Sequence, residues 1–197
     1  RRCSWLRRST DVITLGLLHP GEMGASLGRS ARANGHRVIW ARDGRSAATQ
    51  ARAAAAQLLP VADLAALVVQ SDVIFSVCPP HGAEELAQQV IDAGYRGLFV
   101  DANAIRPERA RRIGVAMEAA GARFVDGGII GNPPNAPWQT RLYLSGPDAA
   151  EVAAMLQGSW HEPIVVGGQP GAASALKLAY AAWNKGRIAL RLAVVAL

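Results

Sequence analysis

The chain has 197 residues, half of them hydrophobic and 18% of them charged, which is typical of a folded globular protein and excludes a disordered one. Its two cysteines, Cys3 and Cys78, indicate neither a disulfide framework nor a zinc site, so we expect no metal. The net charge of +6 comes without interleaved aromatic and basic residues, and we therefore expect no nucleic-acid partner.

The chain begins with a basic segment, residues 1–10, which we predict to be a disordered tail without the apolar stretch of a targeting signal. Strand-like and helix-like runs then alternate over residues 11–168. Predicted strands cover residues 12–18, 37–41, 73–78, 98–101, 123–126, 141–145 and 164–166. Predicted helices run from the first Pro-Gly break to about residue 34, from about residue 45, and over 82–93, 107–120 and 148–157. This alternation predicts an α/β fold: a Rossmann-type, doubly wound, mostly parallel sheet that forms a dinucleotide-binding domain.

The turn after the first predicted strand is a candidate phosphate site, because a helix begins there at once and its N-terminal N–H groups would face a pyrophosphate. Gly21 would let the backbone approach the phosphates, and Gly24 would let the helix pack closely on the strand. The G-x-G-x-x-G fingerprint is incomplete, since its first glycine position holds His19, and an ordinary strand–helix turn is the alternative. The predicted cofactor-binding residues of the turn are His19, Pro20, Gly21, Glu22, Met23 and Gly24.

The end of the second predicted strand bears on the choice of cofactor. Arg42 stands at the strand end and Arg45 one helical turn beyond it, where both could clamp the 2′-phosphate of NADP. Asp43 could instead accept a hydrogen bond from the 2′-hydroxyl of NAD, and the two arginines could be ordinary surface residues. We expect NADP(H), with NAD(H) as the less favoured cofactor.

Residues 169–197 follow a different pattern, with apolar residues at three- and four-residue steps and no stop signal. We predict an interdomain helix that opens a truncated all-α second domain, or that pairs with another copy of itself. The apolar stretch 188–197 is too short to cross a bilayer, so we expect no membrane partner and a cytoplasmic protein.

The chain uses lysine only twice among its 21 basic residues, at Lys177 and Lys185, both on this predicted helix. A lysine can release a proton near neutral pH where an arginine cannot. If Lys177 were partly desolvated beside a nicotinamide, its pKa would be lowered and it could act as a general acid. The alternative is a solvated lysine on an amphipathic helix.

In this order of elements, the turn Gly21-Glu22-Met23-Gly24 resembles the G-x-M-G turn of the β-hydroxyacid dehydrogenase family, which includes 3-hydroxyisobutyrate dehydrogenases, 6-phosphogluconate dehydrogenases and imine reductases. The resemblance covers essentially residues 11–197. It is strongest to phosphogluconate dehydrogenase-like oxidoreductases with a distinct helical C-terminal domain. It implies an NADP-binding Rossmann domain, an interdomain helix, and a homodimer that buries the helical parts.

The resemblance also implies further site residues. The family's proline-containing strand end is matched by Cys78-Pro79-Pro80, where the backbone would pass beside the nicotinamide ribose. Its D-x-S-T-x-x-P segment is matched by residues 101–107, with Asn103 in place of serine as a candidate for cofactor and substrate contact. The family's catalytic lysine corresponds to Lys177.

Two departures from the family pattern concern the substrate. The asparagine expected three or four residues after Lys177 is absent, and Asn184, seven residues on and on the same helix face, is the candidate substitute. The D-x-P-V-S-G-G substrate loop reads as residues 126–132, with Ile130 in place of serine and with Gly131 and Asn132 as the substrate-binding candidates. Because an apolar side chain cannot bind a carboxylate, Ile130 argues against a small β-hydroxyacid.

The leading hypothesis is an NADP-dependent oxidoreductase that moves hydride between the nicotinamide and a carbonyl, alcohol or imine carbon of a small-molecule substrate. Lys177 would donate or accept the proton, and Asn103 and Gly131 would orient the substrate. The alternative is an NADP(H)-binding or interaction protein that keeps a Rossmann core without turnover.

Overall fold

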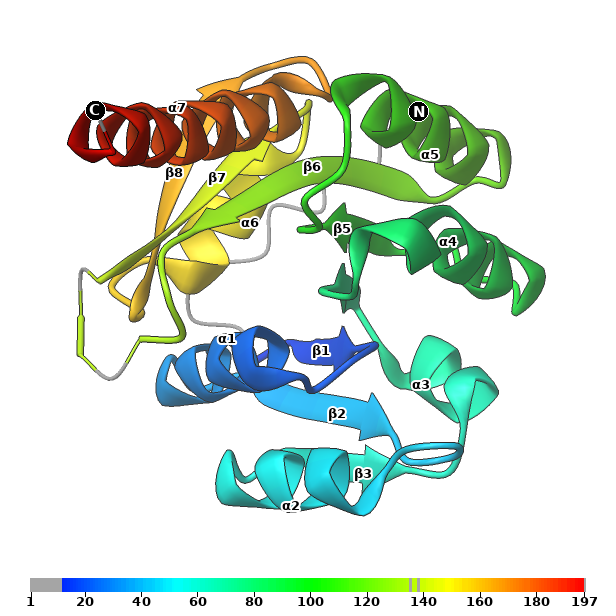
Figure 1. The fold of residues 1–197 in the computed structure, drawn as a ribbon. Helices are drawn as coiled ribbons and strands as arrows, with labels where there is room; N and C mark the ends of the chain where they lie inside the picture. The colour runs from blue at the N-terminus through cyan, green and yellow to red at the C-terminus, as the bar shows by residue number, and fades with distance from the viewer. Residues whose placement is uncertain (1–11, 135, 138, 197) are drawn as a thin grey trace.

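The computed structural model describes residues 12–134, 136–137 and 139–196, so the predicted tail at residues 1–10 lies outside the described residues. One eight-stranded sheet runs in the order β3-β2-β1-β4-β5-β6-β7-β8, and every neighbouring pair is parallel except β6 with β7. The strands are β1 (Thr14–Leu17), β2 (Arg37–Ala41), β3 (Leu59–Val61), β4 (Val73–Ser76), β5 (Leu98–Asp101), β6 (Arg123–Ile130), β7 (Thr140–Ser145) and β8 (His161–Gly167). The helices are α1 (Glu22–Ala33), α2 (Ala47–Ala55), α3 (Leu64–Gln70), the 3-10 turn η1 (Pro80–Gly82), α4 (Ala83–Asp92), α5 (Pro107–Ala119), α6 (Ala149–Leu156) and α7 (Ala172–Val195). The predicted doubly wound α/β fold is confirmed (Figure 1).

In the central strands β1, β2, β4, β5 and β6, successive residues point to opposite sides of the sheet, and nearly all of them are buried. In β5, Val100 packs in the core under α1, α2 and α6, whereas Phe99 packs in the core under α3, α4 and α5. In β6, Val125 and Phe124 divide in the same way. This two-sided burial explains why the strands read as continuous apolar runs rather than as alternating ones.

The sequence analysis missed β3 and α3, which lie between residues 59 and 70. The strand has only three residues, of which Pro60 is one, and α3 has only seven, so neither shows a full hydrophobic period. Asp63 caps α3 by accepting a hydrogen bond from the Ala66 N–H at 2.8 Å. The preceding helix begins at Ala47 rather than at about residue 45, because the Ser46 hydroxyl caps it through the Thr49 N–H.

Strand β6 is twice as long as predicted and runs through most of the expected substrate loop. It covers eight residues instead of the four at 123–126. The extension is held by antiparallel pairing with β7, from Asp126 opposite Ser145 to Ile130 opposite Arg141. The segment predicted as a loop is therefore part of the sheet, and the chain turns only at Gly131.

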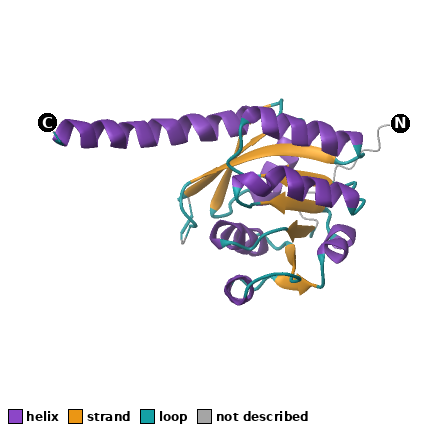
Figure 2. Cartoon of the chain, turned by 45° about the vertical axis from the view of Figure 1, so that its right-hand side comes forward, coloured by secondary structure: helices purple, strands orange, loops and turns teal. Residues whose placement is uncertain are grey.

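Helix α7 has 24 residues and leaves the sheet after its first turns (Figure 2). Its length of about 36 Å follows from a rise of about 1.5 Å per residue. Its buried residues, Ala173 and Ser174, both lie in the first turn. Within the described ranges, no helix combines the length and hydropathy needed to cross a membrane.

Candidate functional site

The sheet order reverses between β1 and β4, which places a topological switch point at their carboxyl ends. Strand β1 leads to β2 on one side, and its other neighbour, β4, leads to β5. In open α/β sheets, ligands bind in the crevice outside such a point. The structure brings the predicted cofactor residues to this edge: the turn after β1, the end of β2 and the segment after β4.

The glycines of the turn after β1 play two different parts. A Cβ at Gly24 would lie 2.1 Å from the His19 carbonyl oxygen and 3.7 Å from Leu17 Cδ1, so only glycine lets α1 start directly against the turn. A Cβ at Gly21 would meet no atom within 4 Å, and this residue has an ordinary φ of −66°. Gly21 is the N-cap of α1, and no side chain caps the helix. The turn thus offers free N–H groups and open space, which is what a pyrophosphate requires.

Two arginines from the β2–α2 region hold this turn from the side. Arg45 Nη2 donates to the Leu18 carbonyl at 3.1 Å, and Arg52 Nη1 donates to the Pro20 carbonyl at 3.3 Å. Burial and the nearby Arg45 charge lower the pKa of His19 to about 4, so the imidazole is neutral at pH 7. Among the described residues, His19 Nδ1 and Arg45 Nε are buried polar atoms without a hydrogen-bond partner. These two atoms fit a site that a polar ligand completes.

The sequence analysis missed Arg52. Arg52 lies on α2, whereas Arg45 precedes the N-cap Ser46, so no helical spacing in the sequence links the two arginines.

Arg42 and Asp43 are exposed at the carboxyl end of β2. Their backbone N–H groups donate to the Val61 and Ala62 carbonyls at 3.0 and 3.1 Å, which fixes this corner of the chain. The Arg42 side chain therefore projects from a fixed backbone toward solvent. Arg45 differs from the prediction in being half-buried and bound to the turn.

Asn103 links the ends of β4 and β5. Its Oδ1 accepts from the Cys78 N–H at 2.5 Å, and its Nδ2 donates to Ser76 Oγ at 2.9 Å and to Asp101 Oδ2 at 3.1 Å. The side chain is buried, and both amide hydrogens are used. In this arrangement Asn103 has no free donor for a substrate, and it instead fixes the backbone of Cys78, which leads into Pro79 and Pro80.

Asp101 holds the Asn103 side chain and backbone in place through hydrogen bonds to both. Its Oδ1 accepts from the Asn103 N–H at 2.9 Å. Burial raises the pKa of Asp101 to about 6, against the lowering effect of the Asn103 hydrogen bonds.

Lys177 lies on the side of α7 that faces β6. Its ammonium group donates to the Ile129 carbonyl, and burial lowers the pKa of Lys177. The helix comes this close because β6 has no side chain at Gly128, where a Cβ would lie 2.9 Å from the Ala173 carbonyl oxygen and 3.1 Å from Lys177 Cβ. The lysine thus sits where β6 extends beyond the end of β5, on the same sheet edge as the glycine turn.

The predicted substrate residues divide into two groups. Gly131 and Asn132 follow directly on β6, close in sequence to the Ile129 carbonyl, and Gly131 has a φ of 130° that suits glycine. Thr140 Oγ1 donates to the Asn132 carbonyl and closes this turn. Asn184 lies about 10 Å further along α7 than Lys177, as seven residues of helix require, and its Oδ1 accepts from Arg187 at 3.3 Å. Gly131 and Asn132 therefore directly follow the part of β6 that Lys177 contacts, whereas Asn184 lies two helical turns further on.

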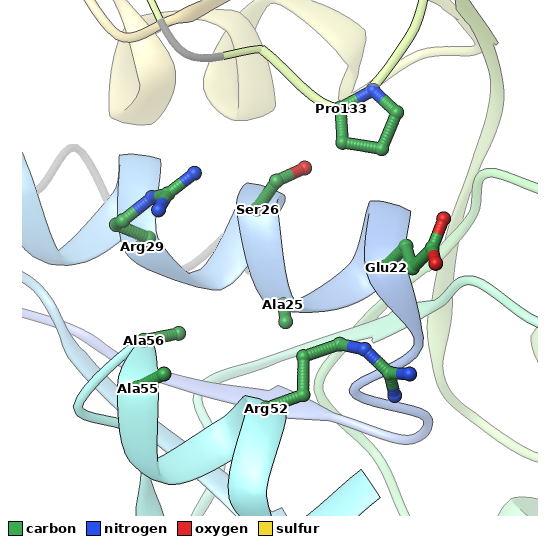
Figure 3. Close-up of a pocket in the computed structure, with 8 residues that line it drawn as sticks. All are labelled: Glu22, Ala25, Ser26, Arg29, Arg52, Ala55, Ala56 and Pro133. Carbon is green, nitrogen blue, oxygen red and sulfur yellow. The ribbon is translucent and has the colours of Figure 1, made fainter. Parts of the chain in front are cut away.

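Two hollows lie in the described chain, and the first borders the start of α1 at Glu22. One of about 270 Å³ lies between α1 and α2 under Pro133, with Glu22, Arg29 and Arg52 around an alanine floor (Figure 3). The other, of about 370 Å³, lies between α5 and the turn before α7, beside Arg111 and Gln169. Neither contains the lysine or the glycines of the turn. Across the described ranges, no three His, Cys, Asp or Glu side chains converge as a metal site requires.

Comparison with known proteins agrees with this geometry. The family model for the NAD-binding domain of 6-phosphogluconate dehydrogenase matches residues 14–157. No curated protein matches the chain in sequence.

Three solved structures illustrate the similarity. A conserved protein described as structurally similar to 3-hydroxyacid dehydrogenases is 30% identical, with a TM-score of 0.77 over 90% of this chain and 67% of that one. An imine reductase variant from Myxococcus stipitatus, in complex with NAD⁺, is 23% identical, with a TM-score of 0.77 over 94% of this chain and 65% of that one. A reductive aminase from Aspergillus terreus, in complex with NADPH, cyclohexanone and allyl amine, is 23% identical, with a TM-score of 0.77 over 92% of this chain and 64% of that one.

The chain thus spans about two thirds of the length of these structures. At 23% identity the two reductases share the fold alone with it. The family model, however, covers most of the chain and includes the glycine turn and the ends of β2, β4 and β5. The chain therefore belongs to the family of 6-phosphogluconate dehydrogenase NAD-binding domains, within the β-hydroxyacid dehydrogenase family of NAD(P)-dependent oxidoreductases.

Proposed function

We propose that the chain acts in an NADP-dependent oxidoreductase that transfers hydride between the nicotinamide and a carbonyl, alcohol or imine carbon. The observation that carries this proposal is the meeting of two features at one sheet edge: the uncapped glycine turn at Gly21 and the half-buried ammonium group of Lys177. The first is suited to holding a pyrophosphate and the second to moving a proton.

Successive segments along this sheet edge would contact successive parts of the cofactor. The N–H groups at the start of α1 would bind the pyrophosphate, and the backbone at Cys78-Pro79-Pro80, fixed by Asn103, would pass beside the nicotinamide ribose. When bound, the nicotinamide supplies or accepts the hydride. The chain's own contribution is to bind, orient and exchange the proton.

The choice of NADP over NAD rests on Arg42 and Arg45. Arg42 is exposed on a fixed strand end and Arg45 lies between that end and the glycine turn, so a 2′-phosphate between them would meet two guanidinium groups. Asp43, also exposed, is the only acidic side chain on this corner between Ala41 and Ser46. The excess of positive charge favours the phosphate.

Lys177 would transfer the proton that accompanies the hydride. Since burial lowers its pKa, the ammonium group gives up its proton more readily than that of a solvated lysine. It would donate from Nζ to the carbonyl oxygen or imine nitrogen during reduction and accept a proton in the reverse direction. Asn103 enters this scheme as a positioning residue, and Gly131 and Asn132 would line the substrate side.

The proton-transfer role is tested by measuring NADPH consumption with a panel of ketones, with and without an amine, for the native chain and for Lys177→Met. We expect turnover to fall by about 10²–10⁴-fold while NADPH affinity stays unchanged, as for a general acid. Lys185→Met, an exposed lysine on the same helix, is the matched control and should be neutral. Equal turnover in Lys177→Met and native chains would remove Lys177 from the mechanism.

A second candidate function is NADP(H) binding without turnover. It is favoured by Ile130, which stands at the position of the family's substrate-binding serine and offers no hydrogen bond. NADPH binding by a native chain that oxidises no NADPH with any ketone or amine would select this candidate.

We also propose that a second copy of the chain covers the outer part of α7. Apolar side chains there are largely exposed, including Trp183 at 69%, Leu190 at 67% and Val195 at 84%. Such a surface favours self-association. Sedimentation velocity at several concentrations should show a dimer, and a monomer at every concentration that binds no apolar dye would contradict the proposal.

A further inference from the structure

Asp126, in the middle of β6, is a fully buried carboxylate with four hydrogen bonds. Its Oδ2 accepts from Ser145 Oγ at 2.8 Å, from the Gly171 N–H at 2.9 Å and from the Ser174 N–H at 3.0 Å. Its Oδ1 accepts from Ser174 Oγ at 2.5 Å. One side chain of the sheet therefore binds the start of α7 three times.

Ser145 of β7 adds to this attachment. Besides donating to Asp126, its hydroxyl oxygen accepts from the Ala173 N–H at 3.0 Å. The N–H groups of Gly171, Ala173 and Ser174 are thus all satisfied by side chains of β6 and β7. Helix α7 has no cap from its own segment, since its N-cap is Gly171, with a φ of 101°. A carboxylate at this helix end is also favoured by the helix dipole.

This attachment fixes the part of α7 that carries the lysine. Lys177 lies one turn beyond Ser174, on the same helix face. Gly128, two residues after Asp126, lets the helix lie directly on β6, within 3.1 Å of a virtual Cβ at that position. The position and rotation of the first turn therefore set where the Lys177 ammonium group lies, at the Ile129 carbonyl.

We infer that Asp126 is a positioning residue, whose carboxylate, assisted by Ser145, holds the first turn of α7 on β6 and so places Lys177 at the site edge. The inference rests on the proposed role of Lys177. A displacement of about 1 Å of a catalytic group can cost about 10²-fold in rate, so this attachment would matter for turnover without touching the substrate.

The two lysines of the chain allow a direct test. Lys177 and Lys185 are the only lysines, and both lie on α7, so trace acetylation followed by peptide mass spectrometry compares them within one sample. In the native chain, Lys177 is half-buried and bound to Ile129, whereas Lys185 is exposed. We expect the two lysines to be labelled at different rates, because burial and the bond to Ile129 restrict access to Lys177 and its lowered pKa changes its amine fraction.

In Asp126→Asn, an NH₂ group replaces one acceptor oxygen among donors, and the first turn should detach. We expect the labelling ratio of the two lysines to move toward 1, and amide exchange of residues 171–178 to rise by about tenfold or more, as loss of a buried hydrogen bond implies. NADPH affinity should stay unchanged, because the glycine turn is not altered. Asp63→Asn removes a capping carboxylate from α3 instead and should leave the labelling ratio at its native value.

A folded Asp126→Asn chain with the native labelling ratio and native exchange in residues 171–178 would overturn the inference. If Asp126→Asn does not fold, Ser145→Ala, which removes one bond to Asp126 and one to the Ala173 N–H, must shift both readouts in the same direction, and no shift would overturn it equally. Neither readout depends on turnover. Failure of the proposed function, seen as unchanged turnover in Lys177→Met, is therefore distinguishable from failure of this inference.

Discussion

Gly21→Ala should change the affinity for NADPH while leaving the free energy of unfolding nearly unchanged, so it tests whether the glycine turn binds phosphate. The added Cβ would meet no atom of the chain within 4 Å, and a φ of −66° with a ψ of −173° is accessible to alanine. Replacing glycine at a compatible site gains about 0.4–1 kcal/mol through the unfolded state. Alanine is a poorer N-cap than glycine by up to about 1 kcal/mol. The two effects oppose each other, so the free energy of unfolding should change by less than about 1 kcal/mol, or roughly 2–4 °C in Tm.

Cofactor binding should respond very differently to Gly21→Ala. The methyl group would occupy the open space from which a pyrophosphate approaches the α1 N-terminus. Loss of one hydrogen bond to a charged group costs about 1.5–3 kcal/mol, which is about 10–150-fold in Kd. Calorimetric unfolding and NADPH titration by tryptophan fluorescence measure the two effects on the same samples.

Two control variants bracket this result. Gly186→Ala, on exposed α7 with no atom near its virtual Cβ, should leave NADPH affinity unchanged and raise the free energy of unfolding by about 0.5–1 kcal/mol, because alanine is the better helix former. Gly24→Ala should lower both the free energy of unfolding and the NADPH affinity, because its Cβ would lie 2.1 Å from the His19 carbonyl oxygen. Native NADPH affinity in Gly21→Ala would refute the reasoning that the α1 N-terminus holds the pyrophosphate.

Three further predictions concern cofactor choice, pH and packing. NADPH should bind the native chain about 10–100-fold more tightly than NADH, and Arg42→Ala should reduce this ratio; equal affinities in the native chain would contradict the Arg42 assignment. Burial, and secondarily Arg29, lower the pKa of His161 to about 4, so the stability that neutral His161 provides should be complete above about pH 6.5 and decline by about 3 kcal/mol as the pH falls toward 4. Urea unfolding of native and His161→Gln chains at several pH values isolates the contribution of His161 to the free energy of unfolding. The same pH dependence of that free energy in both chains would contradict the prediction. Phe124→Ala should lower the free energy of unfolding by about 3–5 kcal/mol, because Phe124 is buried and stacks on Phe99 at 6.4 Å, whereas Val115→Ala on the exposed face of α5 should be nearly neutral; similar urea midpoints for the two variants would show that this packing is not as described.

The alternation of strands and helices was predictable because most strands are buried on both faces and most helices are long enough to show their period. The pattern was insufficient for β3 and α3, because both are short and β3 also contains Pro60. It was also insufficient at Gly127–Gly128, since glycines lower strand propensity and the pairing of β6 with distant β7 holds them in the sheet. Long-range pairing leaves no local signal.

The site could be predicted as far as backbone chemistry and family pattern reach. The glycine turn, Arg42 and Lys177 were predicted as site residues from spacing and residue type. The partners of the buried polar groups were not, because Asp126 with Ser174, or Asn103 with Cys78, meet only when distant segments fold together. Asn103 illustrates the difference: its motif suggested ligand contact, whereas its amide is used between β4 and β5.

The central claim, that the edge between β1 and β4 is the dinucleotide site, is tested most directly by amide hydrogen exchange of the native chain with and without NADPH. We expect protection at the start of α1, in the segment after β4 and around Asn103, with smaller changes at Arg42. Protection of the hollow beside Arg29 and Ala56, or of the hollow beside Arg111, without protection of the segment after β4 and of Asn103 would contradict the claim, as would exchange that NADPH leaves unchanged throughout the chain.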